Sequence, residues 1–402
     1  MQRFFYLLFF VLTSKALLAQ TNNNQGSIMG SYQSDFQYYV EDKGINAIPP
    51  PEKIGFNNYL KLDYQLRDFR VGMRYEHYSP PLLGYPTTFN GTGIANRYIT
   101  YRRDGLEVTA GNFYAQFGSG MALRAQEQRQ LGIDNSIDGL MLKYILGNKA
   151  SITALTGKQR DGFNKSEGTI RGVDAEIYVH EFFPKDSLAK NPIKLTIAGS
   201  IVSRFQSYNG SISSIPNQTE VYAGRFLLIK GDFNISGEYV RKTDDPSALN
   251  NYKQGKGNAG LLNVSYSIGN LSANVSAKRI DNMDFRADRT AVASRLWTNY
   301  VPANTLQHTY RLLTLYPYAV QTLGETAIQA DVSYAFKKGT LIGGQFGAEL
   351  AVNYSLVHNI DSNNVLAFGK RTYYQDANIE ITKKISKKLF WICNHFYRIC
   401  KI

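Results

Sequence analysis

The most regular feature of the chain is an alternation of apolar and polar side chains with a period of two residues. Within 58–78, leucine, tyrosine, valine and methionine occupy one set of positions, and charged residues occupy many of the positions between them. The charged residues at these alternate positions include Lys61, Asp63, Arg70, Arg74 and Glu76. Because successive side chains of a β-strand point to opposite faces, the segment is predicted to form a hairpin that turns at 67–68.

The same pattern recurs in further segments, each about as long as the 9–11 residues that a transmembrane β-strand needs. Many pairs of segments are separated by a turn signal such as Asp104–Gly105 or Gly147–Asn148. The predicted strands are 27–40, 58–66, 69–78, 94–103, 106–113, 137–146, 150–157, 169–181, 193–205, 220–229, 232–243, 259–268, 271–281, 326–336, 341–356, 371–382 and 389–397.

The connections between these strands alternate between short and long. The long ones are 41–57, 79–93, 114–136, 158–168, 206–219, 244–258, 282–325 and 357–370. Short periplasmic turns and long extracellular loops are typical of outer-membrane barrels. We therefore predict an all-β fold class: an antiparallel transmembrane β-barrel of about 16–18 strands, formed as one domain by 20–402. A helical membrane protein is excluded, because no apolar run of about 18 residues follows the N-terminus.

The strand count raises a question about the C-terminal end. The count is odd, whereas bacterial single-chain barrels have an even number of strands and lipid does not tolerate an open sheet edge. Either one strand is missed, at the N-terminus or within 282–325, or the chain is truncated. We favour truncation, because the composition changes near Phe390: both cysteines, Cys393 and Cys400, follow it.

The first residues have the pattern of a secretory signal peptide. Arg3 supplies a positive charge, 4–12 is an apolar run, and small residues precede a predicted cleavage site after Ala19. The run is too short to cross a bilayer as a helix. We expect residues 1–19 to be removed and the mature chain to reach the cell outer membrane.

The net charge of +13 limits the classes of partner to be considered. A basic chain can bind nucleic acid, but no nucleic-acid-binding motif is present and export argues against such a partner. We expect outer-membrane lipid and lipopolysaccharide as partners, with the basic residues contacting lipid phosphates or lining a pore. The chain has no Cys/His metal-binding pattern, and we expect no cofactor.

Two connections are long enough to have roles of their own. The segment 111–139 is either a structured loop folded at the barrel mouth or an ordinary surface loop. The connection 282–325 is longer than an idle loop needs to be, and it is either a recognition element or a disordered tip. It is rich in arginine and aromatic residues, the types enriched at recognition surfaces. Its candidate recognition residues are Arg295, Trp297, Tyr300, Tyr310, Arg311 and Tyr316.

One pair of residues is a candidate for catalysis. His77 and Ser79 lie two apart at a predicted strand end and share a face, so His77 is in a position to activate Ser79. A nucleophile also needs an orienting third group, which the sequence does not place. We predict no catalytic residue and no enzyme activity, and regard an aromatic cluster running into the following loop as the better interpretation.

Several runs of the chain resemble a family of Bacteroidota exported proteins of unknown function, domain of unknown function 6029. The runs are NNYLKLDYQL, FRVGMRYEHYSPPLLGYP, GNFYAQFGSGMALRAQEQRQLGIDNSIDG and TIRGVDAEIY. The resemblance covers at least 26–178. It implies an outer-membrane β-barrel. Members of the family are expected to be longer than this chain, which agrees with truncation. It carries over no catalytic residues.

Two functions follow as hypotheses. The first is a porin-like or plugged channel for small hydrophilic solutes, lined by the charged positions of 58–78. The alternative is a structural barrel that docks an envelope protein partner through its long extracellular loops.

Overall fold

The computed structural model describes residues 26–183, 193–208, 210, 215–308, 317–361, 363–364, 367–386 and 390–400. Within these ranges nearly all regular structure is β-strand. The helices are four single turns of 3₁₀ type: Thr87–Phe89, Arg129–Leu131, Val179–Phe182 and Ala248–Asn250. None of the helices in the described ranges is long and apolar enough to cross a membrane. The signal peptide predicted at 1–19 lies outside the described residues.

The chain divides into two compact units. The first unit comprises Met1–Tyr114, Gln126–Tyr144 and Leu155–Ser166, and the second comprises Ala115–Ala125, Ile145–Ala154 and Glu167–Ile402. Strands β11 (Ala150–Asp161) and β12 (Asn164–Tyr178) each contribute residues to both units. The two units are described in turn.

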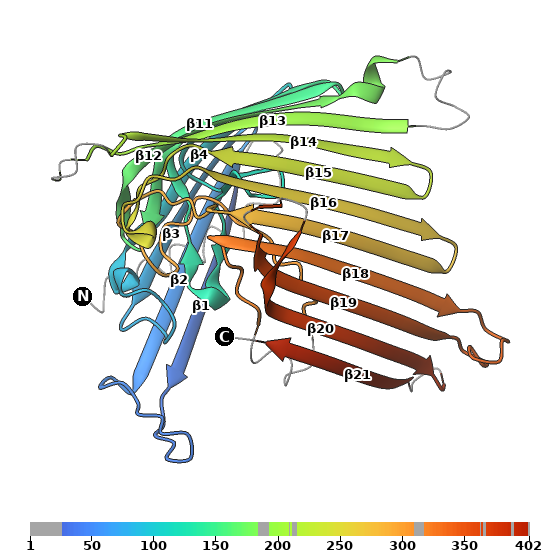
Figure 1. Ribbon diagram of the computed structural model, residues 1–402. Coiled ribbons are helices and arrows are strands. Elements are labelled where there is room, and N and C mark those ends of the chain that lie inside the picture. The colour runs from blue at the N-terminus through green and yellow to red at the C-terminus, as the bar shows by residue number, and fades with distance from the viewer. Residues whose placement is uncertain are drawn as a thin grey trace. The chain divides into compact units, whose positions relative to one another are not determined.

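The first unit is an antiparallel series of strands joined in sequence order (Figure 1). Its long strands are β1 (Ser27–Tyr38), β2 (Ile54–Leu66), β3 (Phe69–Tyr78), β4 (Gly91–Arg103), β5 (Leu106–Phe113) and most of β10 (Ile137–Leu146). Two short strands, β8 (Glu127–Gln128) and β9 (Ile133–Asp134), pair with each other between β5 and β10.

The second unit continues the same up-and-down pattern, and Figure 1 shows its strands following one another from green to red. They are β13 (Ile193–Phe205), β14 (Gln218–Lys230), β15 (Phe233–Lys242), β16 (Gly257–Ile268), β17 (Leu271–Asp281), β18 (Gly324–Phe336), β19 (Ala348–Ile360), β20 (Phe368–Lys384) and β21 (Phe390–Cys400). Two short strands, β6 (Gln116–Phe117) and β7 (Leu123–Arg124), pair with each other.

The predicted fold class is confirmed. The long strands form one antiparallel sheet of 17 strands in sequence order, the topology of an up-and-down barrel. Among the described residues β1 pairs only with β2, and β21 pairs only with β20. In the described part of the chain, each of these two strands therefore has one hydrogen-bonded edge and one open edge, which agrees with the odd strand count.

Several predicted boundaries are wrong. The strand predicted at 169–181 is Asn164–Tyr178, so the long connection predicted at 158–168 is only the turn at 162–163, and the strand predicted at 58–66 already begins at Ile54. The strand predicted at 341–356 begins only at Ala348, because Gly344 and Gly347 have positive φ values of 57° and 96° and form a turn. The strand predicted to end at 157 continues to Asp161, because polar residues at its end face a buried polar environment where they find partners.

The two faces of the sheet differ sharply in chemistry. Large apolar side chains are exposed on one face; in the first unit Leu60 and Val71 are 40% and 44% exposed. Further examples in the second unit are Ile197, Ile201, Tyr222, Phe226, Leu262, Val275, Val332 and Ile379. The opposite face holds charged and amide side chains, and many of them are buried. We refer to these as the apolar face and the polar face.

Candidate functional site

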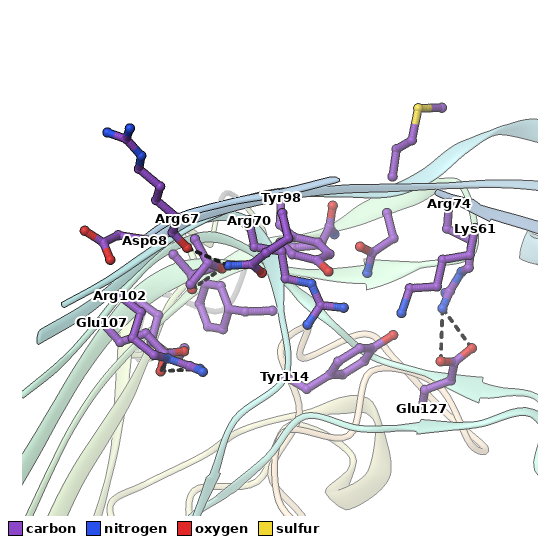
Figure 2. Close-up of a pocket in the computed structure, with 18 of the residues that line it drawn as sticks. Lys61, Arg67, Asp68, Arg70, Arg74, Tyr98, Arg102, Glu107, Tyr114 and Glu127 are labelled. Atoms are coloured by element: carbon purple, nitrogen blue, oxygen red, sulfur yellow. Dashed lines mark hydrogen bonds and ion pairs between the residues drawn. The ribbon is translucent and has the colours of Figure 1, made fainter. Parts of the chain in front are cut away.

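The first unit contains a cavity of about 530 Å³ on the polar face. Strands β2 to β5 supply most of its wall, and Tyr114, Glu127 and Arg129 complete it (Figure 2). Its cationic lining residues are Lys61, Arg67, Arg70, Arg74, Arg102 and Arg129. Its anionic lining residues are Asp68, Glu107 and Glu127. Cations are therefore twice as numerous as anions on this wall.

The five charged residues predicted from alternation all lie on the polar face, and the structure divides them into two groups. Lys61, Asp63 and Arg70 form one, and Arg74 and Glu76 belong to the other. Their assignment to a pore wall remains a prediction.

Asp63 is the centre of the first group. Its carboxylate lies 3.4 Å from Lys61 Nζ and 3.2 Å from Arg70 Nη2, and it accepts a hydrogen bond from the Tyr98 hydroxyl. Three donors thus share one carboxylate. The side chains of Lys61 and Arg70 are still 44% and 42% exposed, whereas that of Asp63 is almost fully buried.

The second group is a buried ionic network. Arg74 of β3 binds Glu76 on its own strand, with 2.5 Å between Nε and Oε1. Its remaining nitrogens bind Glu127, at 3.0 Å, and Asp134. Arg160 of β11 binds the same Asp134, and its Nη2 lies 2.5 Å from Glu76 Oε2. We call Arg74, Glu76, Glu127, Asp134 and Arg160 the ionic latch.

The latch is completed by hydroxyl groups. Tyr78 donates to Glu76 Oε2 at 2.8 Å, and Tyr114 donates to Asp134 Oδ1 at 3.0 Å. Burial alone would raise the pKa of Asp134, but Arg160 and Arg74 outweigh it and hold that pKa below its ordinary value of 3.8. Asp134 is therefore ionised at neutral pH, as a buried carboxylate with two ion pairs requires.

The latch joins the sheet to one connecting segment. Arg74, Glu76 and Arg160 belong to long strands, whereas Glu127 and Asp134 belong to the short strands β8 and β9. We call residues 126–134 the latched segment. Its Arg129 also binds Glu127 at 2.6 Å and stacks over the Tyr59 ring at 4.1 Å.

Sequence reasoning did not find four of the residues that build this site. Tyr98 lay within a predicted strand but carried no charge to mark it. Glu127 and Asp134 lay in a connection, and Arg160 was placed in another because the strand before it was ended too early. The available signal at Glu127, Asp134 and Arg160 was their charge, and Tyr98 offered none.

The second unit holds a second folded connection, residues 283–304, which we call the folded loop. It is joined to the segment 115–125 by backbone hydrogen bonds: Tyr300 N donates to Gly120 O at 2.9 Å, and Arg124 N donates to Thr298 O at 2.7 Å. The Arg124 guanidinium stacks on the Tyr300 ring at 4.0 Å.

Buried side chains on the polar face hold the folded loop in place. Arg204 binds Asp245 at 2.6 Å and donates to the carbonyl of Arg286 at 3.1 Å. Lys278 binds Glu325 at 2.7 Å and donates to the Pro302 carbonyl. Because charged side chains bind its backbone carbonyls, the folded loop is an ordered element rather than a disordered tip.

The structure describes three of the six predicted recognition residues. The Arg286 guanidinium donates to the Arg295 carbonyl at 2.8 Å and lies over the Trp297 ring at 5.3 Å, so these residues help to order the folded loop, as does Tyr300. Tyr310, Arg311 and Tyr316 lie outside the described residues. A recognition role for the set remains a prediction.

The His77–Ser79 pair lies at the end of β3, where both residues are exposed. The register places Asn58 opposite His77, and the Asn58 amide donates to the His77 carbonyl at 3.4 Å. In the described ranges no hydrogen bond joins the two side chains of the pair.

These features define a class: an all-β protein of up-and-down barrel topology, with one apolar face and a polar face on which connecting segments are held by ion pairs. The chain belongs to a family of unknown function, DUF6029, whose model matches residues 1–400. The family predicted by resemblance is thereby confirmed, whereas the Bacteroidota origin remains an expectation.

Comparison with curated proteins gives no match. Comparison with solved structures gives similarity to proteins of Pseudomonas, one of them described as a porin. OpdL of Pseudomonas aeruginosa has 13% identity and a TM-score of 0.49, with 93% of this chain and 92% of that chain covered. OccK5 (OpdH) of the same organism has 11% identity and a TM-score of 0.47, with 93% of this chain and 98% of that chain covered. A BenF-like porin from Pseudomonas fluorescens Pf-5 has 12% identity and a TM-score of 0.46, with 93% of each chain covered.

Proposed function

We propose that this protein is an outer-membrane β-barrel that passes small hydrophilic solutes through a lumen lined by the polar face of its sheet. The observation that carries the proposal is the chemistry of the two faces. A sheet in water does not leave one face of regularly placed leucine, valine and phenylalanine exposed while burying arginine and glutamate on the other. In hydrocarbon this arrangement is favourable, and apolar-out, polar-in alternation is the signature of transmembrane barrels.

Strand length and backbone pairing support the same proposal. Strands such as β3, β13 and β14 have 10, 13 and 13 residues, enough to cross the hydrocarbon core when tilted. From β2 to β20, every long strand has a partner on both sides. Such pairing satisfies the backbone groups, which lipid cannot do. Outer-membrane lipid and lipopolysaccharide would then cover the apolar face.

The cavity beside the ionic latch supports a channel rather than a filled core. It leaves about 530 Å³ between charged side chains, a size that accommodates a small solute. Within the first unit the latched segment is bound to side chains of the polar face, and within the second unit the folded loop is bound in the same way. We therefore propose a channel restricted by ordered segments rather than a wide pore.

The test is reconstitution of the full chain. After expression with its N-terminal segment, cell fractionation should place the protein in the outer membrane. The purified protein in planar bilayers should give stepwise ion conductance, and the same preparation boiled beforehand is the control. A folded, heat-modifiable barrel that stays silent would contradict the channel. It would favour the alternative of a barrel that docks an envelope partner through its long loops.

A further inference from the structure

The acidic groups around the Figure 2 cavity already have partners. The Asp63 carboxylate forms an ion pair with Lys61 and accepts hydrogen bonds from Arg70 and Tyr98. Glu127 accepts hydrogen bonds from Arg74 and Arg129, and Glu107 Oε2 accepts two from Arg102, at 2.9 and 2.7 Å. A solute entering the cavity meets carboxylates that are engaged with protein donors.

The basic groups are in a different situation, because each has more donors than its partner uses. Arg70 contacts Asp63 through Nε and Nη2, and Arg102 contacts Glu107 through the same two atoms. In the described part of the chain their Nη1 groups carry no further contact. Lys61 has three N–H donors, and its ion pair within the described residues is the long one to Asp63, at 3.4 Å. The three side chains are 42%, 72% and 44% exposed, respectively.

Figure 2 shows how these groups are arranged. Arg70, Tyr98 and Lys61 come from the strand wall, Arg102 lies with Glu107 to one side, and Tyr114 faces the wall from below. The cavity is therefore lined by unused N–H donors on positively charged groups. Planar guanidinium groups favour carboxylate and phosphate oxygens.

We propose that this cavity is a binding site for small anionic solutes that carry a carboxylate or phosphate group, held by Lys61, Arg70 and Arg102. This inference deepens the proposed function, because it assigns a substrate class to the channel. Anions are favoured over cations because Lys61, Arg70 and Arg102 offer unused donors on positive charges. Among the lining acids, Glu107 and Glu127 are engaged by arginines at short distance, and Asp68 lies 3.8 Å from Arg103. Anions are favoured over neutral solutes because each of the three groups with unused donors carries a positive charge.

The first test measures binding at equilibrium, without transport. The full-length protein in detergent is titrated with succinate and with inorganic phosphate at low salt, using isothermal calorimetry, and choline and glucose serve as cationic and neutral probes. Succinate, phosphate or both should bind, and which of them binds tells carboxylate from phosphate as the preferred group. Binding of neither anion, or equal binding of choline, would overturn the proposal.

The variant Lys61→Gln/Arg102→Gln removes two cavity charges while leaving Asp63 bonded to Arg70 and Tyr98. We expect at least about tenfold weaker anion binding, since charge-assisted hydrogen bonds are lost. The matched control Lys337→Gln/Lys338→Gln removes the same charge from an exposed turn of the second unit and should bind like the native protein. Equal loss in both variants would overturn the site. Should the first variant misfold, Lys61→Gln/Asp63→Asn/Arg70→Gln removes the acid together with its cations.

The second test separates this inference from the proposed function. In bilayers with a tenfold KCl gradient, the reversal potential should show preference for chloride, and the preference should fall in Lys61→Gln/Arg102→Gln only. Conductance without any anion preference would overturn the anion site and leave the channel standing. Anion binding by a silent barrel would overturn the channel and leave the site standing.

Discussion

Arg74 of β3 and Asp134 of β9 form a buried ion pair although 60 residues separate them in the sequence. The pair joins a long strand to the latched segment, and Arg160 binds the same carboxylate from a third element. The position of the latched segment therefore depends on one carboxylate shared by two guanidinium groups.

Removing that charge should release the segment. Asp134→Asn leaves Arg74 and Arg160 with a buried excess of positive charge, and breaking a buried ion pair costs about 3–5 kcal/mol. We expect faster hydrogen exchange across 126–134 and larger single-channel conductance. The control Glu107→Gln makes the same chemical change in a pair whose arginine is 72% exposed, and it should cost less than about 1 kcal/mol. Equal exchange rates in the two variants would contradict the latch.

The latch should be insensitive to mild acid. The pKa of Asp134 is lowered in the folded protein, so its contribution to stability is present above its ordinary pKa of 3.8 and is lost as the pH falls through the folded value. Hydrogen exchange of 126–134, corrected for intrinsic rates, should stay constant from pH 8 to about pH 5 and rise only in stronger acid. A transition near pH 6 would show that another group controls the segment.

The folded loop should depend on Arg204. Arg204→Gln leaves Asp245 with Lys242, 3.2 Å away, as its remaining cation and removes a donor to the Arg286 carbonyl. We expect a loss of about 3–5 kcal/mol, with faster hydrogen exchange across 283–304. Arg171→Gln changes an arginine at an exposed strand position and should leave this exchange unchanged.

Adjacent positions of β18 test the membrane face. Val332 is 44% exposed on the apolar face, whereas Ser333, the next residue along the strand, points to the opposite face and is half-buried. In lipid vesicles Val332→Arg should destabilise the fold by about 2–4 kcal/mol, the cost of a lipid-facing arginine near the bilayer centre, whereas Ser333→Arg should be tolerated. Urea unfolding in vesicles measures both. The reverse order would contradict the membrane proposal.

Features that depend on neighbouring residues could be predicted from the sequence, and contacts between residues far apart in the chain could not. Alternation is local, so it placed Arg74 and Glu76 on the correct face and gave 17 strands. The partners of these residues are not local: Glu127 and Arg160 lie 53 and 84 positions from their contacts. No periodicity relates such positions, and the packing of loops decides which charges meet.

The loop residues show the same limit. Trp297 and Tyr300 were singled out for their chemistry, which is equally suited to binding a ligand and to ordering a loop. The guanidinium groups of Arg286 and Arg124 that lie over their rings come from other positions, one of them in a different connection. Sequence alone could not show that these contacts exist.

The latch and its neighbour Arg129 contain three positive and three negative side chains: Arg74, Arg129 and Arg160 against Glu76, Glu127 and Asp134. In the proposed channel, a passing ion would therefore experience little net field from this group, although the group holds a segment that would limit the width of the channel. The donors that would attract anions, Lys61, Arg70 and Arg102, lie outside it. Width and charge preference would then be set by separate residues, so that relatives could change the size of the solute they admit without changing its charge.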